Sequence, residues 1–335
     1  MPDKRRIPTV LITNDDGPPG EESPFIEAFV GALHHSLGWR TKVCIPSNQR
    51  SWIGKALLVN ETVALEKYKP PTKDGSGDDV DECWYLATGT PASCVNIALH
   101  HLFADIDLVI SGPNLGSNVA NTCAFASGTL GAAMEAALNG TCAAALSFAF
   151  YNRDISPAKT QNACAMACSV LDRLWQADMW GTCGAGVFNI NVPLVDVADR
   201  PVYLTAMGRS RFGSLYRKTS DTNYDASINP VTGLHIKTAG AAGETNAALA
   251  IGDGEDPAAR KCSETTADTA EDGSSGLEFV FSSSAPTNKV SGPGTDSWAV
   301  RHRFISVTPL RPELQSLGSA NCEALWSSLG FNFAS

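Results

Sequence analysis

The sequence contains no apolar run that approaches the length of a membrane-spanning helix, and no apolar signal segment follows Met1 to Arg6. Basic residues are also scarce: 25 lysines and arginines stand against 35 aspartates and glutamates, which gives a formal net charge of -10. A surface of that sign repels polyanions, so we do not expect general nucleic-acid binding. We expect a cytoplasmic protein with no membrane association.

Four motifs that mark large enzyme classes are missing. No Gly-x-Gly-x-x-Gly follows the first strand, which removes the main signal of a dinucleotide enzyme. No Gly-x-x-x-x-Gly-Lys-Ser/Thr occurs, which argues against a P-loop NTPase. No Gly-x-Ser-x-Gly turn is present, and the six histidines show no His-Glu-x-x-His spacing. A zinc hydrolase is therefore not expected.

The ten cysteines show no Cys-x-x-Cys pairs and no zinc-finger spacing. Cys44, Cys94 and Cys142 lie inside apolar runs. We interpret most cysteines as reduced, buried, small apolar side chains, since disulfides are rare in cytosolic proteins.

Short apolar segments alternate with helical patterns along the first two thirds of the chain. Alternating strands and helices require crossover connections, and they predict an α/β fold with a doubly wound, mostly parallel, Rossmann-like sheet. One helix is expected to begin at Ser23-Pro24, with Ser23 as its cap, and to end at Gly38. The other predicted strands and helices are strands 10–13, 41–45, 83–87, 106–110, 143–148 and 186–191, and helices 93–103, 129–138 and 157–176.

The pattern changes after about residue 209. Residues 210–296 are rich in Gly, Ser, Thr, Asp and Ala, and we interpret them as an irregular insertion within a single domain, 1–335, with a mobile loop at 252–275. A strand is expected within 298–308 as a C-terminal β extension, followed by a helix at 322–329.

Two adjacent aspartates, Asp15 and Asp16, end the first predicted strand. Ligands of open α/β sheets bind at the carboxyl ends of the strands, and two carboxylates placed there repel each other unless a positive group lies nearby. A hard divalent cation would supply that group. A plain turn explains Asp-Asp-Gly equally well, because these residues favour turns.

Further polar loops follow other strands on the same side of the predicted sheet. Ser51 offers a hydroxyl and Asn114 an amide oxygen, which with the two aspartates make an oxygen-only ligand set suited to Mg²⁺, Mn²⁺ or Ca²⁺. The N–H groups at the start of the helix that begins at Ser127-Gly128-Thr129 can hold phosphate oxygens. A metal there would polarise a phosphoryl group and lower the pKa of a bound water.

The ordered set of these motifs resembles the SurE survival-protein family, over about residues 8–208 and 292–312. It consists of Asn-Asp-Asp-Gly, a Gln-Arg-Ser loop, Gly-Thr-Pro-Ala-Ser-Cys-Val, Ser-Gly-Pro-Asn-x-Gly, Ser-Gly-Thr with Ala-Ala-Met-Glu-Ala, Phe-Asn-Ile-Asn-Val-Pro and Gly-Thr-Asp. The asparagine loop, Ser-Gly-Pro-Asn-Leu-Gly-Ser-Asn, resembles the eukaryotic branch more than the bacterial one, and leaves Asn118 as a candidate substrate residue.

The resemblance implies a metal-dependent 5'- or 3'-nucleotidase or acid phosphatase that acts on nucleoside monophosphates or other phosphomonoesters. It implies that the metal ligands are Asp15, Asp16, Ser51 and Asn114, with catalysis by Asp15 and Asp16. It also implies a homodimer or higher oligomer, for which residues 298–335 are the expected interface. A non-catalytic binding module that serves a partner protein is the alternative.

Overall fold

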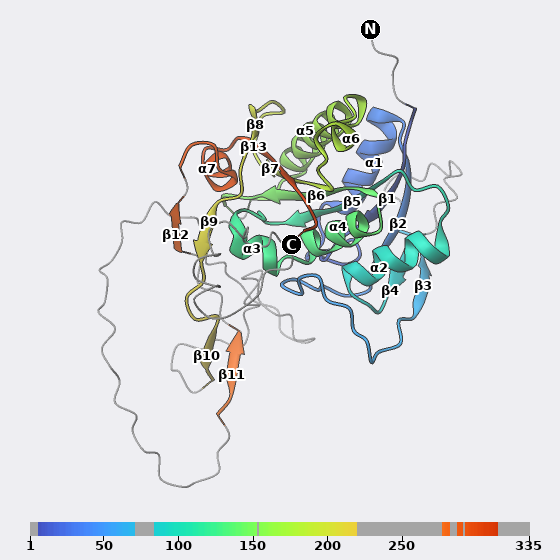
Figure 1. Ribbon diagram of the computed structural model, residues 1–335, viewed down its shortest axis with the longest axis horizontal. Coiled ribbons are helices and arrows are strands. Elements are labelled where there is room, and N and C mark those ends of the chain that lie inside the picture. The colour runs from blue at the N-terminus through green and yellow to red at the C-terminus, as the bar shows by residue number, and fades with distance from the viewer. Residues whose placement is uncertain are drawn as a thin grey trace, which may run out of the picture.

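The computed structural model describes residues 6–70, 84–152, 154–219, 277–281, 287–290 and 292–313. Its centre is a nine-stranded sheet with the order β3-β4-β2-β1-β5-β6-β7-β13-β8 (Figure 1). The strands from β4 to β7 pair in parallel, β3 and β13 are antiparallel to their neighbours β4 and β7, and β8 is parallel to β13. The predicted α/β, mostly parallel fold is therefore confirmed. The strands of this sheet are β1 (Thr9–Thr13), β2 (Arg40–Pro46), β3 (Leu65–Tyr68), β4 (Trp84–Ala87), β5 (Leu108–Leu115), β6 (Cys142–Ala149), β7 (Val187–Pro193), β8 (Val202–Leu204) and β13 (Ile305–Leu310).

Helices cover both faces of the sheet, as a doubly wound topology requires (Figure 1). Alternate residues of β1 enter different cores: Val10 and Ile12 pack with the helices of one face, and Leu11 packs with those of the other. The first face carries α1 (Ile26–Leu37), α5 (Pro157–Gln176) and α6 (Met179–Cys183), and the second carries α2 (Pro91–Ile97), the π-helical turn η1 (Ala98–Leu102) and α4 (Gly128–Leu138).

Two helix starts differ from the sequence prediction. Helix α1 begins at Ile26 after Phe25 and has no side-chain cap, and the Ser23 hydroxyl accepts a hydrogen bond from the Asn14 amide. Helix α2 begins earlier than expected, since the Thr90 hydroxyl accepts the Ser93 N–H and Pro91 occupies the first turn. The predicted end of α1 at Gly38 is confirmed, with Gly38 in the left-handed conformation.

The structure also differs from the sequence prediction after residue 295. Residues Asp296–Arg301 form a short helix, α7, capped by Thr295, where the sequence analysis placed the start of a strand. The strand itself, β13, lies between β7 and β8 inside the sheet. Residues 252–275 and the predicted helix 322–329 lie outside the described residues.

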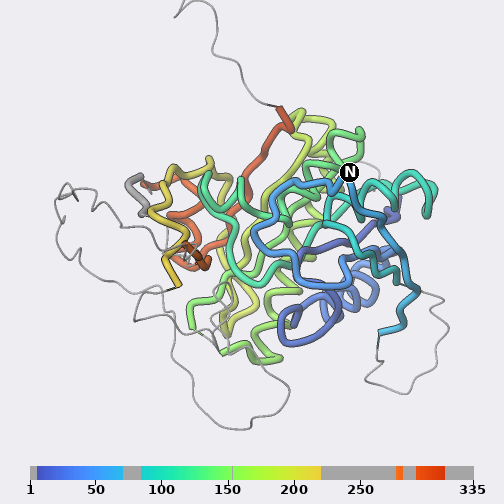
Figure 2. The backbone as a smooth tube through the Cα atoms, turned by 90° about the horizontal axis from the view of Figure 1, so that it is seen from below, coloured from blue at the N-terminus to red at the C-terminus, as the bar shows by residue number. Residues whose placement is uncertain are grey.

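The described parts of 210–296 contain short strands that the sequence did not indicate. Figure 2 shows the yellow and orange-red segments of this region running close together. The pairs are β10 (Tyr216–Lys218) with β11 (Phe279–Phe281), and β9 (Arg209–Arg211) with β12 (Thr287–Val290), both antiparallel. Helix α3 (Ala120–Ala126) was also not predicted.

Candidate functional site

The turn after β1 fixes the two aspartates. The side chain of Asn14 forms two hydrogen bonds across this turn: its amide donates to the Gly17 carbonyl at 2.8 Å, and its Oδ1 accepts the Gly17 N–H at 3.1 Å. Gly17 has a φ of 84°, and a Cβ there would lie 3.2 Å from the carbonyl carbon of Asn48, so glycine is required. The carboxylates of Asp15 and Asp16 thus leave the strand end in a fixed direction.

Asp15 lies against the start of α4. The Thr129 hydroxyl donates to Asp15 Oδ1 at 2.6 Å, and the backbone N–H groups of Gly128 and Thr129 also bond this carboxylate. A Cβ on Gly128 would lie 2.8 Å from Asp15 Cβ, so only glycine allows this approach. The Ser127 hydroxyl accepts the Leu130 N–H at 3.1 Å and caps the helix. The predicted phosphate-holding residues therefore adjoin the predicted metal ligand.

Asp16 connects the end of β1 to the end of β5. Its Oδ2 accepts the Leu115 N–H at 2.8 Å, which brings Asn114 next to it along the chain. Asn114 lies within β5, which is longer than predicted. Its Nδ2 donates to the Gly116 carbonyl at 2.9 Å, which leaves Oδ1 as the atom able to act as a ligand.

The pKa values of both carboxyls are raised. Burial raises the pKa of Asp15, against which its hydrogen bonds from Thr129 and Gly128 act. Burial also raises the pKa of Asp16, well above its ordinary value, and the charge of Asp15 raises it further. Among the ion pairs of the described residues, none involves either aspartate. A cation would offset both effects, so these residues fit a divalent metal.

The segment after β2 reaches the same edge. The Arg50 N–H donates to the Asp15 carbonyl at 2.7 Å. Ser51 is the next residue along the chain and is half-buried. Trp52 has a φ of 64°, an uncommon conformation for a bulky residue. Its ring lies 5.2 Å from that of Phe212 and 5.0 Å from that of Phe281, centroid to centroid.

Asn118 lies deeper than a substrate residue at a surface would. It is 7% exposed, its N–H donates to Asn191 Oδ1 at 2.8 Å, and its side chain donates to Ser147 Oγ at 3.0 Å. The Asn189 amide donates to its carbonyl at 2.8 Å. The sequence analysis did not assign this network a role, although two asparagines inside the apolar strand β7 are a detectable signal.

A second unassigned residue is Asp296, which is fully buried. Its carboxylate accepts N–H groups of Ala120 at 2.9 Å, Gly208 at 2.8 Å and Ser297 at 2.6 Å. It thereby ties the start of α3, next to Asn118, to the segment before β9. The Gly-Thr-Asp motif was the signal for it.

An open cleft of about 440 Å³ adjoins Asp16. Glu21, Glu22 and the segment 47–49 also line it. Within the ranges that the structure describes, no group of three or more His, Cys, Asp or Glu side chains could hold a metal ion. A metal at this edge would therefore need hydroxyl and amide oxygens besides the two carboxylates.

In the same described ranges, no helix has the length and apolar character needed to cross a membrane.

Comparisons with known proteins agree with the fold and the motifs. The family described as survival protein SurE matches residues 10–214. A 5'-nucleotidase SurE from Syntrophotalea carbinolica is 27% identical over 319 residues, which cover 95% of this chain and 97% of that protein. The crystal structure of the SurE protein from Aquifex aeolicus matches with a TM-score of 0.58 at 21% identity, over 97% of this chain and all of that one, which shows the same fold.

A relative of different size is the probable tubulin–tyrosine ligase PBY1 of Saccharomyces cerevisiae. It is 34% identical over 239 residues, which cover 61% of this chain but only 31% of the yeast protein. The match to the family covers more than half of the present sequence and includes both aspartates, Ser51, Asn114 and the start of α4. The chain therefore belongs to the SurE family.

Proposed function

We propose that this chain is a divalent-metal-dependent phosphomonoesterase that hydrolyses nucleoside monophosphates. One observation carries the proposal: Asp15 and Asp16 are buried side by side, with no ion-pair partner among the described residues, where β1 ends against the start of α4. Two such carboxylates are unfavourable without a cation and become favourable with one.

Four residues would hold the metal: Asp15, Asp16, Ser51 and Asn114. All offer oxygen, which suits Mg²⁺, Mn²⁺ or Ca²⁺. When bound, such a cation polarises the phosphoryl group and lowers the pKa of a water. Asp15 is the better candidate to orient the attacking water, because Thr129 already fixes its carboxylate.

The phosphate would lie at the start of α4. The positive end of the helix would stabilise negative charge there, in a protein whose net charge is -10, and Thr129, which donates its hydroxyl hydrogen to Asp15, would hold that carboxylate beside the phosphate. Ser127 and Gly128 shape this helix start by capping it and by allowing close approach to Asp15. Asn118, the predicted substrate residue, would act from the buried hydrogen bonds that it forms with Ser147, Asn189 and Asn191.

The nucleoside preference rests on two supports. Relatives such as the Syntrophotalea protein are named 5'-nucleotidases. In addition, the aromatic cluster of Trp52, Phe212 and Phe281 begins one residue after Ser51 and offers rings on which a base can stack.

A non-catalytic binding module is the second candidate, and the yeast relative favours it. That protein is named a probable tubulin–tyrosine ligase, and the matching segment covers only 31% of it, so the SurE-like part there accompanies other sequence. A module of this kind would retain the fold without turnover.

Phosphate release separates the two candidates. We expect the purified chain to release phosphate from AMP and from an aryl phosphate with Mn²⁺ or Mg²⁺, and to lose this activity in EDTA. Asp15→Asn is the matched control for a contaminating phosphatase. Full activity in excess chelator would overturn the metal assignment, and no release with any divalent cation would favour the binding module.

A further inference from the structure

We infer that Glu135 is a positioning residue, which through Lys55 holds the segment 50–56 and its Ser51 against helix α4. The inference concerns the metal-ligand role of Ser51, and in that respect it rests on the proposed function. That Glu135 holds the segment 50–56 against α4 follows from contacts between described residues and does not depend on the proposed function. Neither Glu135 nor Lys55 belongs to the metal and phosphate residues described above.

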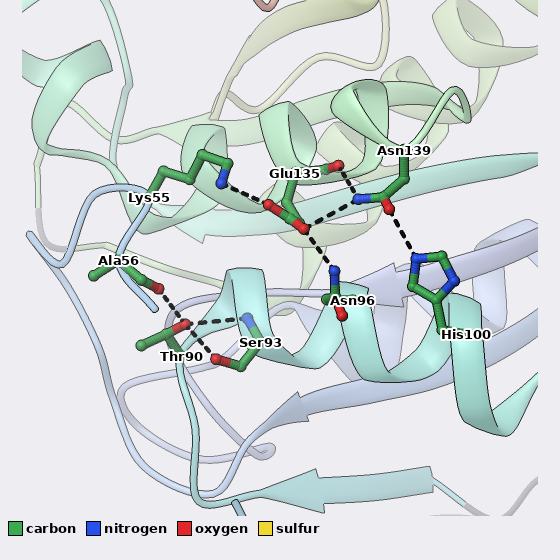
Figure 3. Close-up of polar contacts among 8 residues, drawn as sticks. All are labelled: Lys55, Ala56, Thr90, Ser93, Asn96, His100, Glu135 and Asn139. Carbon is green, nitrogen blue, oxygen red and sulfur yellow. Dashed lines mark hydrogen bonds and ion pairs between the residues drawn. The ribbon is translucent and has the colours of Figure 1, made fainter. Parts of the chain in front are cut away.

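Glu135 is a buried carboxylate in the middle of the second helical layer. It lies on α4, is 5% exposed, and its Oε2 is 2.6 Å from Lys55 Nζ. Its Oε1 accepts hydrogen bonds from Asn96 on α2 at 2.8 Å and from Asn139 at 3.0 Å (Figure 3). One carboxylate thus joins α4, α2 and the segment that follows β2.

The segment 50–56 has further contacts on both sides of Lys55. The Gly54 N–H donates to the Ala126 carbonyl at 2.9 Å, and a Cβ on Gly131 would lie 2.5 Å from the Gly54 oxygen. The Thr90 hydroxyl donates to the Ala56 carbonyl at 2.6 Å (Figure 3). Ser51 lies between these contacts and the Arg50 N–H bond to Asp15. Its position relative to Asp15 therefore depends on how firmly residues 54–56 are held by α4, by the end of α3 and by the cap of α2.

Charge makes the Glu135 contact the one most sensitive to substitution. Burial acts to raise the pKa of Glu135, but the bonds from Lys55, Asn96 and Asn139 outweigh it and lower that pKa. The carboxylate is thus charged at neutral pH, and Lys55, whose side chain is 34% exposed, is its cation. Removing one partner of such a pair leaves the other uncompensated, which disturbs the segment more than losing a neutral bond.

The test compares four variants: Glu135→Gln, Lys55→Met, the double variant of these two and, as a matched control, Lys159→Met. Lys159 also forms an ion pair, 2.6 Å from Asp154, and its side chain is 8% exposed, but it lies on α5 at the opposite face of the sheet. Two measurements are made: amide hydrogen exchange of peptides covering 50–58 in metal-free protein, and the Mn²⁺ concentration that gives half-maximal phosphate release.

We expect Glu135→Gln and Lys55→Met each to speed exchange in 50–58 by about tenfold or more. Each should also raise the half-maximal Mn²⁺ concentration by a similar factor. The kcat at saturating Mn²⁺ should stay within about threefold of the wild-type value. The double variant should do no more than either single one, because the two side chains act as a pair. Lys159→Met should change neither measurement.

A lower melting temperature with unchanged exchange in 50–58 would overturn the inference and leave Glu135 a purely structural residue. So would an unchanged Mn²⁺ requirement in Lys55→Met, the variant better placed to fold because Lys55 is partly exposed. If the wild-type chain releases no phosphate at all, the proposed function fails, while the exchange measurement still decides whether the pair holds the segment.

Discussion

Thr129 donates its hydroxyl hydrogen to Asp15 Oδ1 at 2.6 Å, and both residues are buried. The bond joins Asp15, a proposed metal ligand, to the start of α4, the proposed phosphate site. In the proposed function the metal and phosphate roles are therefore coupled through one contact, and substitutions on either side should affect both.

Thr129→Val should test this coupling. Valine keeps the shape but leaves a buried carboxylate oxygen without its hydroxyl donor, which typically destabilises a protein by about 1 to 3 kcal/mol. We expect a higher KM or lower kcat for phosphate esters, measured by steady-state phosphate release. Thr160→Val, which removes another buried hydroxyl on α5, is the control and should leave kinetics unchanged. Equal effects of the two variants would contradict the assignment.

Asp15→Asn should lower kcat/KM by about three orders of magnitude or more, because the substitution removes a metal ligand and a group that orients water at once. Circular dichroism and the melting temperature should show an intact fold, since asparagine fills the same space. Activity within about tenfold of the wild type would mean that the two aspartates serve only the turn.

Asp16 should make the metal-free protein less stable as pH rises. Burial and then the neighbouring Asp15 charge raise its pKa in the folded state, so the folded state retains a proton that the unfolded chain releases. The stability linked to that proton is full below the unfolded pKa of about 4 and is lost as pH rises through the folded value. Melting temperatures in EDTA should therefore fall across this range, and less steeply in Asp16→Asn.

Mn²⁺ should restore the stability that the wild type loses as pH rises, and it should do so far less in Asp16→Asn. A ligand at about one hundred times its Kd stabilises the folded state by about 2.7 kcal/mol. Asp16→Asn should gain much less from Mn²⁺ while being more stable than the wild type without it. The assignment is refuted if Mn²⁺ shifts the melting temperatures of both proteins equally at neutral pH.

Trp52→Ala should separate recognition of the base from recognition of the phosphate. Stacking of one base on an aromatic ring contributes about 1 to 3 kcal/mol, so KM for AMP should rise by about fivefold or more. KM for glycerol phosphate, which has no ring, should change little. A parallel rise for both substrates would instead show that Trp52 supports the Ser51 segment, as its contacts with Phe212 and Phe281 also permit.

The assembly prediction remains open to a direct measurement. We expect a homodimer or an assembly of dimers in which residues 298–335 contribute to the interface. Within one chain β13 pairs with β7 and β8, and the same pairing could form with a second subunit by exchange of this strand. Light scattering at micromolar concentration should give at least twice the monomer mass. A monomer mass, or an assembly unchanged by deletion of this segment, would contradict the prediction.

The sequence predicted elements where one local signal dominates. The apolar run before Asp15 correctly predicted β1, which is buried on both faces, and the pattern of 157–176 correctly predicted α5, which is buried on one face. It failed where contacts distant in sequence decide. The strand expected within 298–308 begins only at Ile305, because the Thr295 cap and the bonds of Asp296 to Ala120 and Gly208 begin a helix before it.

The candidate site shows the same division. Asp15 and Asp16 stood out because charged residues end an apolar strand, and Asn114 because it follows another. Glu135 entered the sequence analysis only as part of the Ala-Ala-Met-Glu-Ala motif, with no role of its own, and only the approach of Lys55 and Asn96 from other elements shows what it contacts. Contacts between segments that are distant along the chain leave no local pattern in the sequence, so they could not be predicted.

The place of β13 has a consequence for synthesis of the protein. Among the strands that the structure describes, β8 pairs with β13 alone, although the whole of 210–296 separates the two along the chain. On the ribosome, a nascent chain that ends before Ile305 leaves β7 as an open edge, and open edges invite pairing with other chains. The long separation of β8 and β13 along the chain costs little in itself, since each doubling of a loop's length adds only about 0.6 kcal/mol of closure entropy. The exposed edge of β7 is therefore the larger hazard, and it is covered only once β13 has been synthesised.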